Sequence, residues 1–440
     1  MTIGDNFSES LIHKIFSYLS YEDAANSSLL SKTWQQAWLT QPSLKFKVEY
    51  GKGNNNRKIV DKIMERYKEE KYPIDKFELD ITSSPYHHAL AFPRIDNWLD
   101  IALQNGVKDV VCKVDVPSYP FPISSFLASK SLRELVLTGC DIMSLWLSTS
   151  TSDHQRMNCR SLRKLSLSNV RLDHNVLQTL NLKSLKLSHM SISQGFLEHL
   201  ISTSQNLESL ILDFVYGELH ERFNICRSQS LKVLRIDGCK DIGEIDASNL
   251  VSFDYVGYEI PELKITNVSN QLKNSQTYLS CYSNSTDVEW FCKLRKFLSN
   301  LTSWSQVSLH IGECNDINMK DLGLHPRVAI PQVLVLDIDM RFNDVSICPN
   351  FVDVLLWSCH PKKLNLLSAV ETITCFMDRL MYLKNSSHST SDGSIPWDSQ
   401  LKEVKAFKFI SDNEHVEVDR EDLAMMTRTE IDKFCFLLDW

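Results

Sequence analysis

A six-residue pattern, L-x-x-L-x-L, recurs along the chain and constrains its fold more than any other feature. From Leu132 to Leu250 successive copies follow one another at about 24 residues, a step typical of proteins in which each repeat stacks on the next. The copies, some with another apolar residue in place of leucine, begin at Ile74, Val107, Leu132, Leu162, Leu182, Leu207, Leu231 and Leu250. One copy alone cannot bury its apolar face, so the chain is predicted to form a continuous stack from residue 74 onward.

The spacing within each copy predicts a short strand. Alternate residues of a strand point to opposite faces, so the leucines are expected to face a core while the intervening residues face solvent. Helical pieces such as Phe196–Ile201 lie between strands and are expected to cover the outer face. The predicted fold class is therefore α/β, a leucine-rich-repeat solenoid with a parallel sheet on the concave face and helices and loops on the convex face. Weaker copies are read at Trp304/Val307/Leu309, Val333/Leu336/Ile338 and Pro361/Leu364/Leu366.

The twelve cysteines contain no C-x-x-C pair, and two of them have a structural explanation. Cys140 and Cys239 each lie eight residues after a leading leucine, where Asn or Cys usually turns the chain out of the strand. The remaining thiols are predicted to be reduced and mostly buried, because no signal peptide is visible at the N-terminus. A net charge of -8 argues against a general binder of nucleic acid or anionic membrane. No apolar run reaches the ~18 residues of a membrane span, so we predict a cytoplasmic and/or nuclear protein.

The first forty residues carry a large apolar load in three short helical patterns. Asn6 and Glu9 suit a capped first helix, and Trp34 and Trp38 share one face of a third helix that ends before Pro42. About forty residues rarely support a stable core alone, so part of this apolar surface is expected to dock on something else. The alternative is an ordinary amphipathic helical cap on the next domain.

This stretch resembles an F-box. The resemblance rests on Ile15–Leu19, Asp23–Ala25 and Leu29–Trp34, with Trp38 four residues further on, while Phe7-Ser8 stands where the family usually has Leu-Pro. It implies docking on a Skp-type adaptor and, through that adaptor, on cullin and RING subunits. It also implies that Trp34 and Trp38 join the F-box to the first repeats. The adaptor-binding residues that the resemblance indicates are Phe7, Ser8, Leu11, Ile12, Ile15, Ala24, Leu29 and Leu30.

Later stretches resemble plant F-box proteins that combine leucine-rich repeats with an FBD region. Trp98–Val110 resembles the tryptophan-containing helix and first clear strand of that family, and Phe126–Cys140 resembles its next repeat. Trp357–Pro361 and Leu401–Val404 look like the entry to, and the core of, the FBD region. The closing alternation from Phe434 to Trp440 favours a terminal strand. The predicted domains are an F-box over 1–47, a linker and connecting helix over 48–73, the repeat solenoid over 74–366 and a small C-terminal α+β FBD-like region over 367–440.

No sequence motif for catalysis or cofactor binding is found. The chain lacks G-x-x-x-x-G-K-[ST], G-x-G-x-x-G, H-E-x-x-H and G-x-S-x-G. Asp337 and Asp339 share one strand face and suit a metal ion, but a solvated edge is the favoured interpretation. His87-His88 is predicted to lie in a loop, and Cys281 and Cys292 lack zinc-ligand spacing. We therefore predict a protein that is not an enzyme and that binds no cofactor and no metal.

The family resemblance implies a substrate-recognition subunit of an SCF-type (Skp-cullin-F-box) ubiquitin ligase, in which the repeats bind a target protein. One alternative is a non-ligase leucine-rich-repeat scaffold with a degenerate F-box, which measured affinity for the adaptor distinguishes. Another is a small-molecule-sensing F-box receptor, which a ligand-induced melting shift would support. We expect an unknown protein substrate and neither nucleic acid nor membrane as a partner. The residues predicted to contact the substrate from the concave face are Glu134, Val136, Lys164, Ser166, Ser184 and Lys186.

Overall fold

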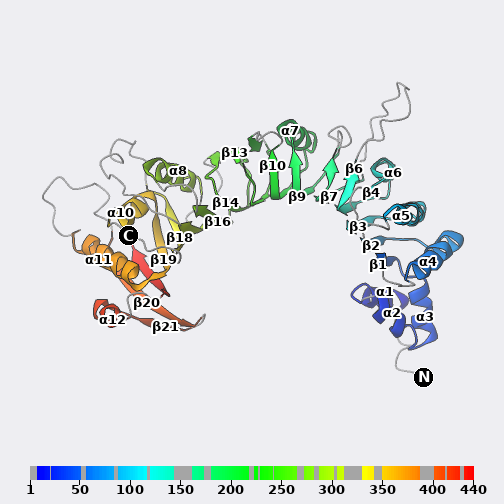
Figure 1. The fold of residues 1–440 in the computed structure, drawn as a ribbon, viewed down its shortest axis with the longest axis horizontal. Helices are drawn as coiled ribbons and strands as arrows, with labels where there is room; N and C mark the ends of the chain where they lie inside the picture. Colours follow the sequence, from blue (N-terminus) through cyan, green and yellow to red (C-terminus); the bar gives the residue numbers. More distant parts are fainter. Residues whose placement is uncertain are drawn as a thin grey trace. The chain divides into compact units, whose positions relative to one another are not determined.

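The structure is a computed structural model of the chain, and it divides into two compact units, Met1–Glu218 and Leu219–Trp440. The ribbon in Figure 1 follows the chain from the N-terminal helices to the C-terminal strands. The residues that the structure describes are 7–19, 21–50, 56–83, 88–115, 119–142, 161–172, 180–217, 222–225, 228–240, 242–264, 272–281, 287–301, 305–311, 330–340, 349–386, 401–411, 414–426 and 431–440.

The first unit begins with three short helices, α1 (Glu9–Phe16), α2 (Tyr21–Ser27) and α3 (Lys32–Leu39), as the sequence predicts. Ser8 occupies the N-cap of α1, and its side chain makes no capping hydrogen bond; the predicted cap, Asn6, lies outside the described residues. At α3 the Ser31 hydroxyl accepts a hydrogen bond from the Trp34 backbone N–H at 3.4 Å, which fixes the start of that helix.

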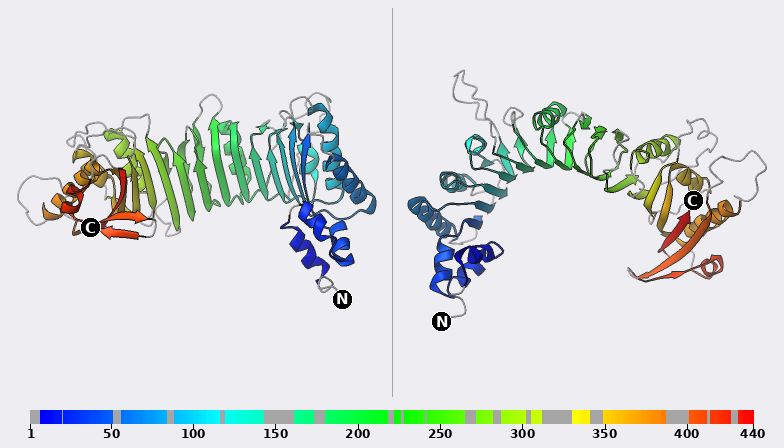
Figure 2. Two further views of the ribbon diagram at one scale, coloured as in Figure 1. Left: turned by 60° about the horizontal axis from the view of Figure 1, so that its bottom comes forward. Right: turned by 180° about the vertical axis from the view of Figure 1, so that it is seen from behind.

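The strands of the first unit are all parallel to their neighbours, and Figure 2 shows them side by side. Leu135, Leu165, Leu185 and Leu210 lie in register on four neighbouring strands, and all four are buried, so the predicted inward leucines are confirmed. In spatial order the strands are β1 (Ser43–Tyr50), β2 (Lys76–Ser83), β3 (Asp109–Asp115), β5 (Glu134–Thr138), β7 (Lys164–Ser168), β9 (Ser184–Ile192) and β10 (Ser209–Gly217).

The parallel sheet starts earlier than residue 74, where the sequence placed its beginning. β1 pairs with β2 along its whole length, and α4 (Asn56–Glu70) follows it with Val60, Ile63, Met64 and Tyr67 buried. The stretch from Ser43 onward is therefore already a strand-helix unit of the stack rather than a linker. Its strand follows Gln41 where the other copies have a leading apolar residue, so the L-x-x-L-x-L pattern does not include it.

Helices and short strands cover one side of this sheet (Figure 1). The helices are α4, α5 (His88–Gln104), α6 (Ile123–Ala128) and α7 (Gln194–Thr203), and α7 buries the predicted Phe196–Ile201 face. His88 begins α5 rather than lying in a loop, whereas His87 is outside the described residues. A second, small parallel sheet is formed by β4 (Tyr119–Pro120), β6 (Cys140–Ile142) and β8 (Arg171–Leu172), which the repeat pattern did not predict.

Gly139 makes the turn from strand β5 to strand β6. Its φ is +74°, a left-handed conformation that glycine adopts without steric cost, and its N–H donates to the Ser168 carbonyl at 3.0 Å. A Cβ at this position would lie 2.1 Å from the Val114 carbonyl oxygen. Cys140 follows and is buried at 1% exposure, in agreement with the predicted structural role of this cysteine.

The second unit continues the same construction. Leu309, Leu336 and Leu364 are buried on three of its parallel strands, as the weaker repeat copies predicted, and Trp304 lies outside the described residues. Its parallel strands are β12 (Val233–Asp237), β14 (Ser252–Gly257), β16 (Asn274–Cys281), β17 (Gln306–Ile311), β18 (Gln332–Asp339) and β19 (His360–Ala369), and a small second sheet holds β11 (Phe223–Ile225), β13 (Ile242–Asp246) and β15 (Glu262–Lys264). Its helices are α8 (Val288–Leu298), α10 (Pro349–Ser358), α11 (Val370–Ser386) and α12 (Arg420–Ala424).

At the C-terminus the strand pairing changes from parallel to antiparallel. β22 (Ile431–Asp439) confirms the predicted terminal strand, and it lies antiparallel between β19 and β20 (Glu403–Ser411). β21 (Glu414–Glu417) follows β20 as the last strand of the order. Because β19 runs to Ala369 and pairs directly with β22, the sheet continues without interruption past residue 366, the predicted end of the repeat solenoid.

Asp337 and Asp339 lie on β18, which has β17 and β19 on either side, and so they are not at the edge of a sheet. Asp337 accepts hydrogen bonds from the Ser308 hydroxyl at 3.3 Å and from the Asn365 amide at 2.7 Å. Among the described residues no group of three or more His, Cys, Asp or Glu side chains is arranged to hold a metal ion. None of the described helices combines the length and apolar character needed to span a membrane.

Candidate functional site

The three N-terminal helices pack around a small core of their own. Ile12 is fully buried and Ala24 is 2% exposed, while Phe16 and Trp34 pack edge to face at 5.5 Å between ring centroids. Ile15 is partly buried against the same cluster. Ile12 and Ala24 therefore leave the set of adaptor-binding residues, because their side chains face the interior of the helical unit and have no surface left for a partner.

Outside this core, several large apolar side chains face solvent. Leu29 is 83% exposed and Leu30 59% exposed in the turn between α2 and α3, and Leu11 is 43% exposed on α1. Phe7 is 40% exposed and contacts Trp34 edge to face, and Tyr18 is 79% exposed. A monomeric protein rarely gathers so many exposed apolar side chains on so few residues, and such groups mark interaction sites.

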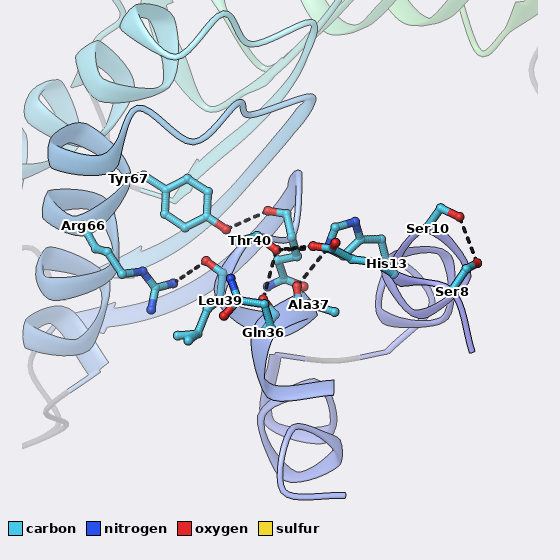
Figure 3. Close-up of polar contacts among 11 residues, drawn as sticks. Ser8, Ser10, His13, Gln36, Ala37, Leu39, Thr40, Arg66 and Tyr67 are labelled. Atoms are coloured by element: carbon cyan, nitrogen blue, oxygen red, sulfur yellow. Dashed lines mark hydrogen bonds and ion pairs between the residues drawn. The ribbon is translucent and has the colours of Figure 1, made fainter. Parts of the chain in front are cut away.

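Polar contacts tie the two ends of this helical unit together (Figure 3). The His13 imidazole Nε2 lies 3.0 Å from the Ala37 carbonyl oxygen, and the Thr40 hydroxyl donates to the Glu9 carboxylate at 2.9 Å. Helix α1 is thereby fixed against the C-terminal end of α3. Ser8, a predicted adaptor contact, is exposed and its hydroxyl lies 3.1 Å from that of Ser10.

Helix α4 attaches the helical unit to the first strands. The Arg66 guanidinium donates to the Leu39 carbonyl at 3.0 Å, and the Tyr67 hydroxyl donates to the Gln41 carbonyl at 2.7 Å (Figure 3). Arg66 of α4 also lies 5.9 Å above the Trp38 ring. Trp38 therefore contacts α4, the helix that follows the first strand, as the family resemblance implied. Trp34 is a buried member of the helical core together with Ile12, and Trp38 also packs against that core.

The residues predicted to bind substrate form two rows on the open face of the first unit's sheet. Their register aligns Glu134, Lys164 and Ser184 in one row and Val136, Ser166 and Lys186 in the next. None of the six is buried, so the period-2 assignment is correct as to which face they occupy.

The charges in these rows are paired across strands. Lys164 lies 3.6 Å from Glu134, and Lys186 lies 2.8 Å from Asp213, which also accepts from the Ser188 hydroxyl at 3.3 Å. Asp213 and Ser188 were not among the predicted contacts. Both directly follow the second inward leucine of their strands, and Ser188 is buried at 4% exposure while Asp213 is partly exposed.

Two family models match this chain. The F-box domain model matches residues 5–46, and a model described as "FBD-associated F-box protein At5g56370, LRR repeats" matches residues 124–253. The first range contains the three N-terminal helices and the start of β1, and the second runs from α6 through β5, β7, β9 and β10 of the first unit into β14 of the second.

Curated relatives from Arabidopsis thaliana agree with these models. The F-box/FBD/LRR-repeat protein At1g13570 is 30% identical over 138 residues, which are 30% of this chain and 32% of that protein. Two further proteins, At3g58860 and At5g22720, carry names that describe an F-box protein and an FBD-associated F-box protein. They are 26% and 27% identical over 61% and 68% of this chain, and the alignments span 54% and 60% of their own lengths.

The three helices with their exposed leucines therefore match an F-box domain, and the leucine-lined strands between residues 124 and 253 match leucine-rich repeats. Over these regions the chain is similar to FBD-associated F-box/LRR proteins of Arabidopsis thaliana.

Proposed function

We propose that this protein is the substrate-recognition subunit of an SCF-type ubiquitin ligase. The observation that carries the proposal is the exposure of Leu29, Leu30, Leu11 and Phe7 outside a helical core that is already complete. Burying these side chains against an adaptor removes apolar surface from water, which is the main source of affinity in protein association. Ile15 is partly buried against the helical core, so in the proposal it contributes less surface to the adaptor than the exposed side chains do.

The protein contributes proximity to this reaction. A client held on the open face of the sheet is presented to a ubiquitin-conjugating enzyme at a raised effective concentration, and no catalytic side chain is required for that. The hydrogen bonds from Arg66 and Tyr67 to the end of the F-box hold the three helices in one orientation to the first strands. A client on that sheet would therefore be held at a fixed position relative to the adaptor-binding helices. In the proposal the complex also contains cullin and RING subunits, reached through the adaptor, and the compartment is the cytoplasm or nucleus.

Adaptor affinity tests the proposal and separates it from the scaffold alternative. The full-length chain is titrated with purified Skp-type adaptor by isothermal titration calorimetry, and we expect a dissociation constant between about 1 nM and 10 μM. Absence of binding at about 100 μM, by a chain that remains folded, contradicts the ligase role and leaves a non-ligase scaffold. Capture of clients under proteasome inhibition, comparing the wild type with an adaptor-binding variant, then identifies what the repeats hold.

A further inference from the structure

The two faces of the C-terminal antiparallel strands have opposite character. On one face, Phe434 and Phe436 are buried opposite Leu366 and Leu364, and α11 packs against β19, β20 and β22 on this side (Figure 1). Successive residues of a strand alternate between faces, so the odd-numbered residues of β19, β20 and β22 point away from this core. Leu437, at 42% exposure, is one of them.

On that open face, two ammonium groups converge on one aromatic ring. Lys363 Nζ lies 5.8 Å and Lys433 Nζ 5.0 Å from the centroid of Phe409. The ring of His415, on the neighbouring strand β21, packs at 6.3 Å from Phe409 and at 5.3 Å from Phe407. The result is a half-buried aromatic surface flanked by positive charge, built from the four strands β19, β20, β21 and β22.

Neither of these two lysines has an anionic partner in the part of the chain that the structure describes. The other lysines nearby do: Lys405 lies 3.3 Å from Glu403, and Lys408, on the α11 face, lies 2.7 Å from Asp432. A cation above an aromatic face gains some attraction from the ring quadrupole, but two like charges sharing one ring repel each other. An incoming pair of carboxylates removes that repulsion.

We infer that this surface, which we call the Phe409 face (Lys363, Phe407, Phe409, His415, Lys433 and Leu437), binds an acidic segment of a client protein. The chemistry that fits is an apolar side chain packed on Phe409 with carboxylates on either side to meet the two ammonium groups. Naming the ligand a client rests on the proposed ligase function, whereas the binding itself does not.

Charge at the border of the Phe409 face favours a protein over a nucleic acid. Glu417 lies opposite Phe407, and Glu403 pairs in register with Asp439 at the end of the strands. A polynucleotide carries a phosphate at every residue and would meet these carboxylates, and the chain as a whole has a net charge of -8. A short acidic segment places its charge only where Lys363 and Lys433 stand.

The test measures binding of a short fluorescein-labelled peptide with a central Glu-Phe-Glu to the full-length chain by fluorescence anisotropy. We expect saturable binding that weakens with added salt, and a loss of about tenfold in affinity for the Lys363→Gln/Lys433→Gln variant. The matched control is Lys264→Gln/Lys296→Gln, which removes the same charge from two lysines paired at 2.7 Å with Glu244 and Glu262 in the same unit. The control variant is expected to bind within twofold of the wild type, and Phe409→Leu to bind more weakly.

Three outcomes overturn the inference. The peptide binds no better than its Gln-Phe-Gln analogue; or the control variant loses as much affinity as the Lys363→Gln/Lys433→Gln variant; or an oligouridylate displaces the peptide and binds more tightly, which would make the face a nucleic-acid site. Adaptor affinity is measured on the same proteins. It is expected to be unchanged, so that failure of the peptide experiment is distinguishable from failure of the ligase proposal.

Discussion

Replacing Leu29 and Leu30 together by alanine tests the proposed adaptor surface most directly. Full burial of a leucine is worth about 1.5–3 kcal/mol, and the two side chains are 83% and 59% exposed in the free protein. If both become buried against the adaptor, their truncation removes about 3 kcal/mol of binding free energy, which corresponds to roughly 100-fold in the dissociation constant. The same truncation should change the free energy of unfolding by less than about 0.5 kcal/mol, because neither side chain packs inside the protein.

The assay is calorimetric titration with the adaptor, alongside thermal melting of each variant. Ile410→Ala/Met425→Ala serves as the matched control, because these side chains are 61% and 90% exposed in the second unit. It should bind the adaptor like the wild type. Ile12→Ala is the contrasting core change, expected to cost about 2–5 kcal/mol of stability through the cavity it leaves. The reasoning is refuted if Leu29→Ala/Leu30→Ala binds within threefold of the wild type, or if the control loses affinity equally.

Three further predictions concern stability, measured by thermal or denaturant unfolding. Gly139→Ala should cost about 3 kcal/mol or more, because a left-handed φ is combined with a backbone clash, whereas Gly106→Ala, with φ +76° and open space, should cost only about 1–2 kcal/mol. Burial, with a smaller contribution from a nearby arginine, lowers the pKa of His360 to about 4 from 6.5. The unfolded chain therefore binds more protons between these values, and stability should fall by about 3 kcal/mol as the pH drops from 6.5 to 4. Arg379→Met should cost about 3–5 kcal/mol, because it leaves the buried Asp353 carboxylate without its two 2.6 Å hydrogen bonds.

Each of these has its own control. Equal losses for the two glycine variants would show that strain rather than the clash at Gly139 decides the cost. His360→Phe keeps an aromatic ring against Trp440, on which His360 stacks at 3.8 Å, and should flatten the pH dependence; an unchanged slope would assign it to other groups. Adding Asp353→Asn to Arg379→Met should restore part of the lost stability, because burying a neutral amide costs less free energy than burying an unpaired carboxylate.

Much of the fold could be read from the sequence because the repeat is a local signal. Leu135 and Leu137 are buried because two apolar residues at period 2 sit on one face of a strand wherever that strand lies. The same holds for the amphipathic α7 and for the cysteine after Gly139. The short sheets β4-β6-β8 and β11-β13-β15 were missed, since strands of two to five residues carry too few positions to show a period.

The sequence by itself determined that three apolar N-terminal helices precede a leucine-lined parallel sheet, because composition and spacing within single elements are enough for that. Only the tertiary structure decided which apolar residues lie in the core of the three helices and which face solvent. Ile12 and Leu11 are neighbours in one helix, yet Ile12 is fully buried and Leu11 is 43% exposed. The tertiary structure also determines the ion pair between Glu134 and Lys164 and the contacts of Lys363 and Lys433 with the Phe409 ring. Such contacts depend on the register of strands that lie far apart along the chain, and no local pattern records it.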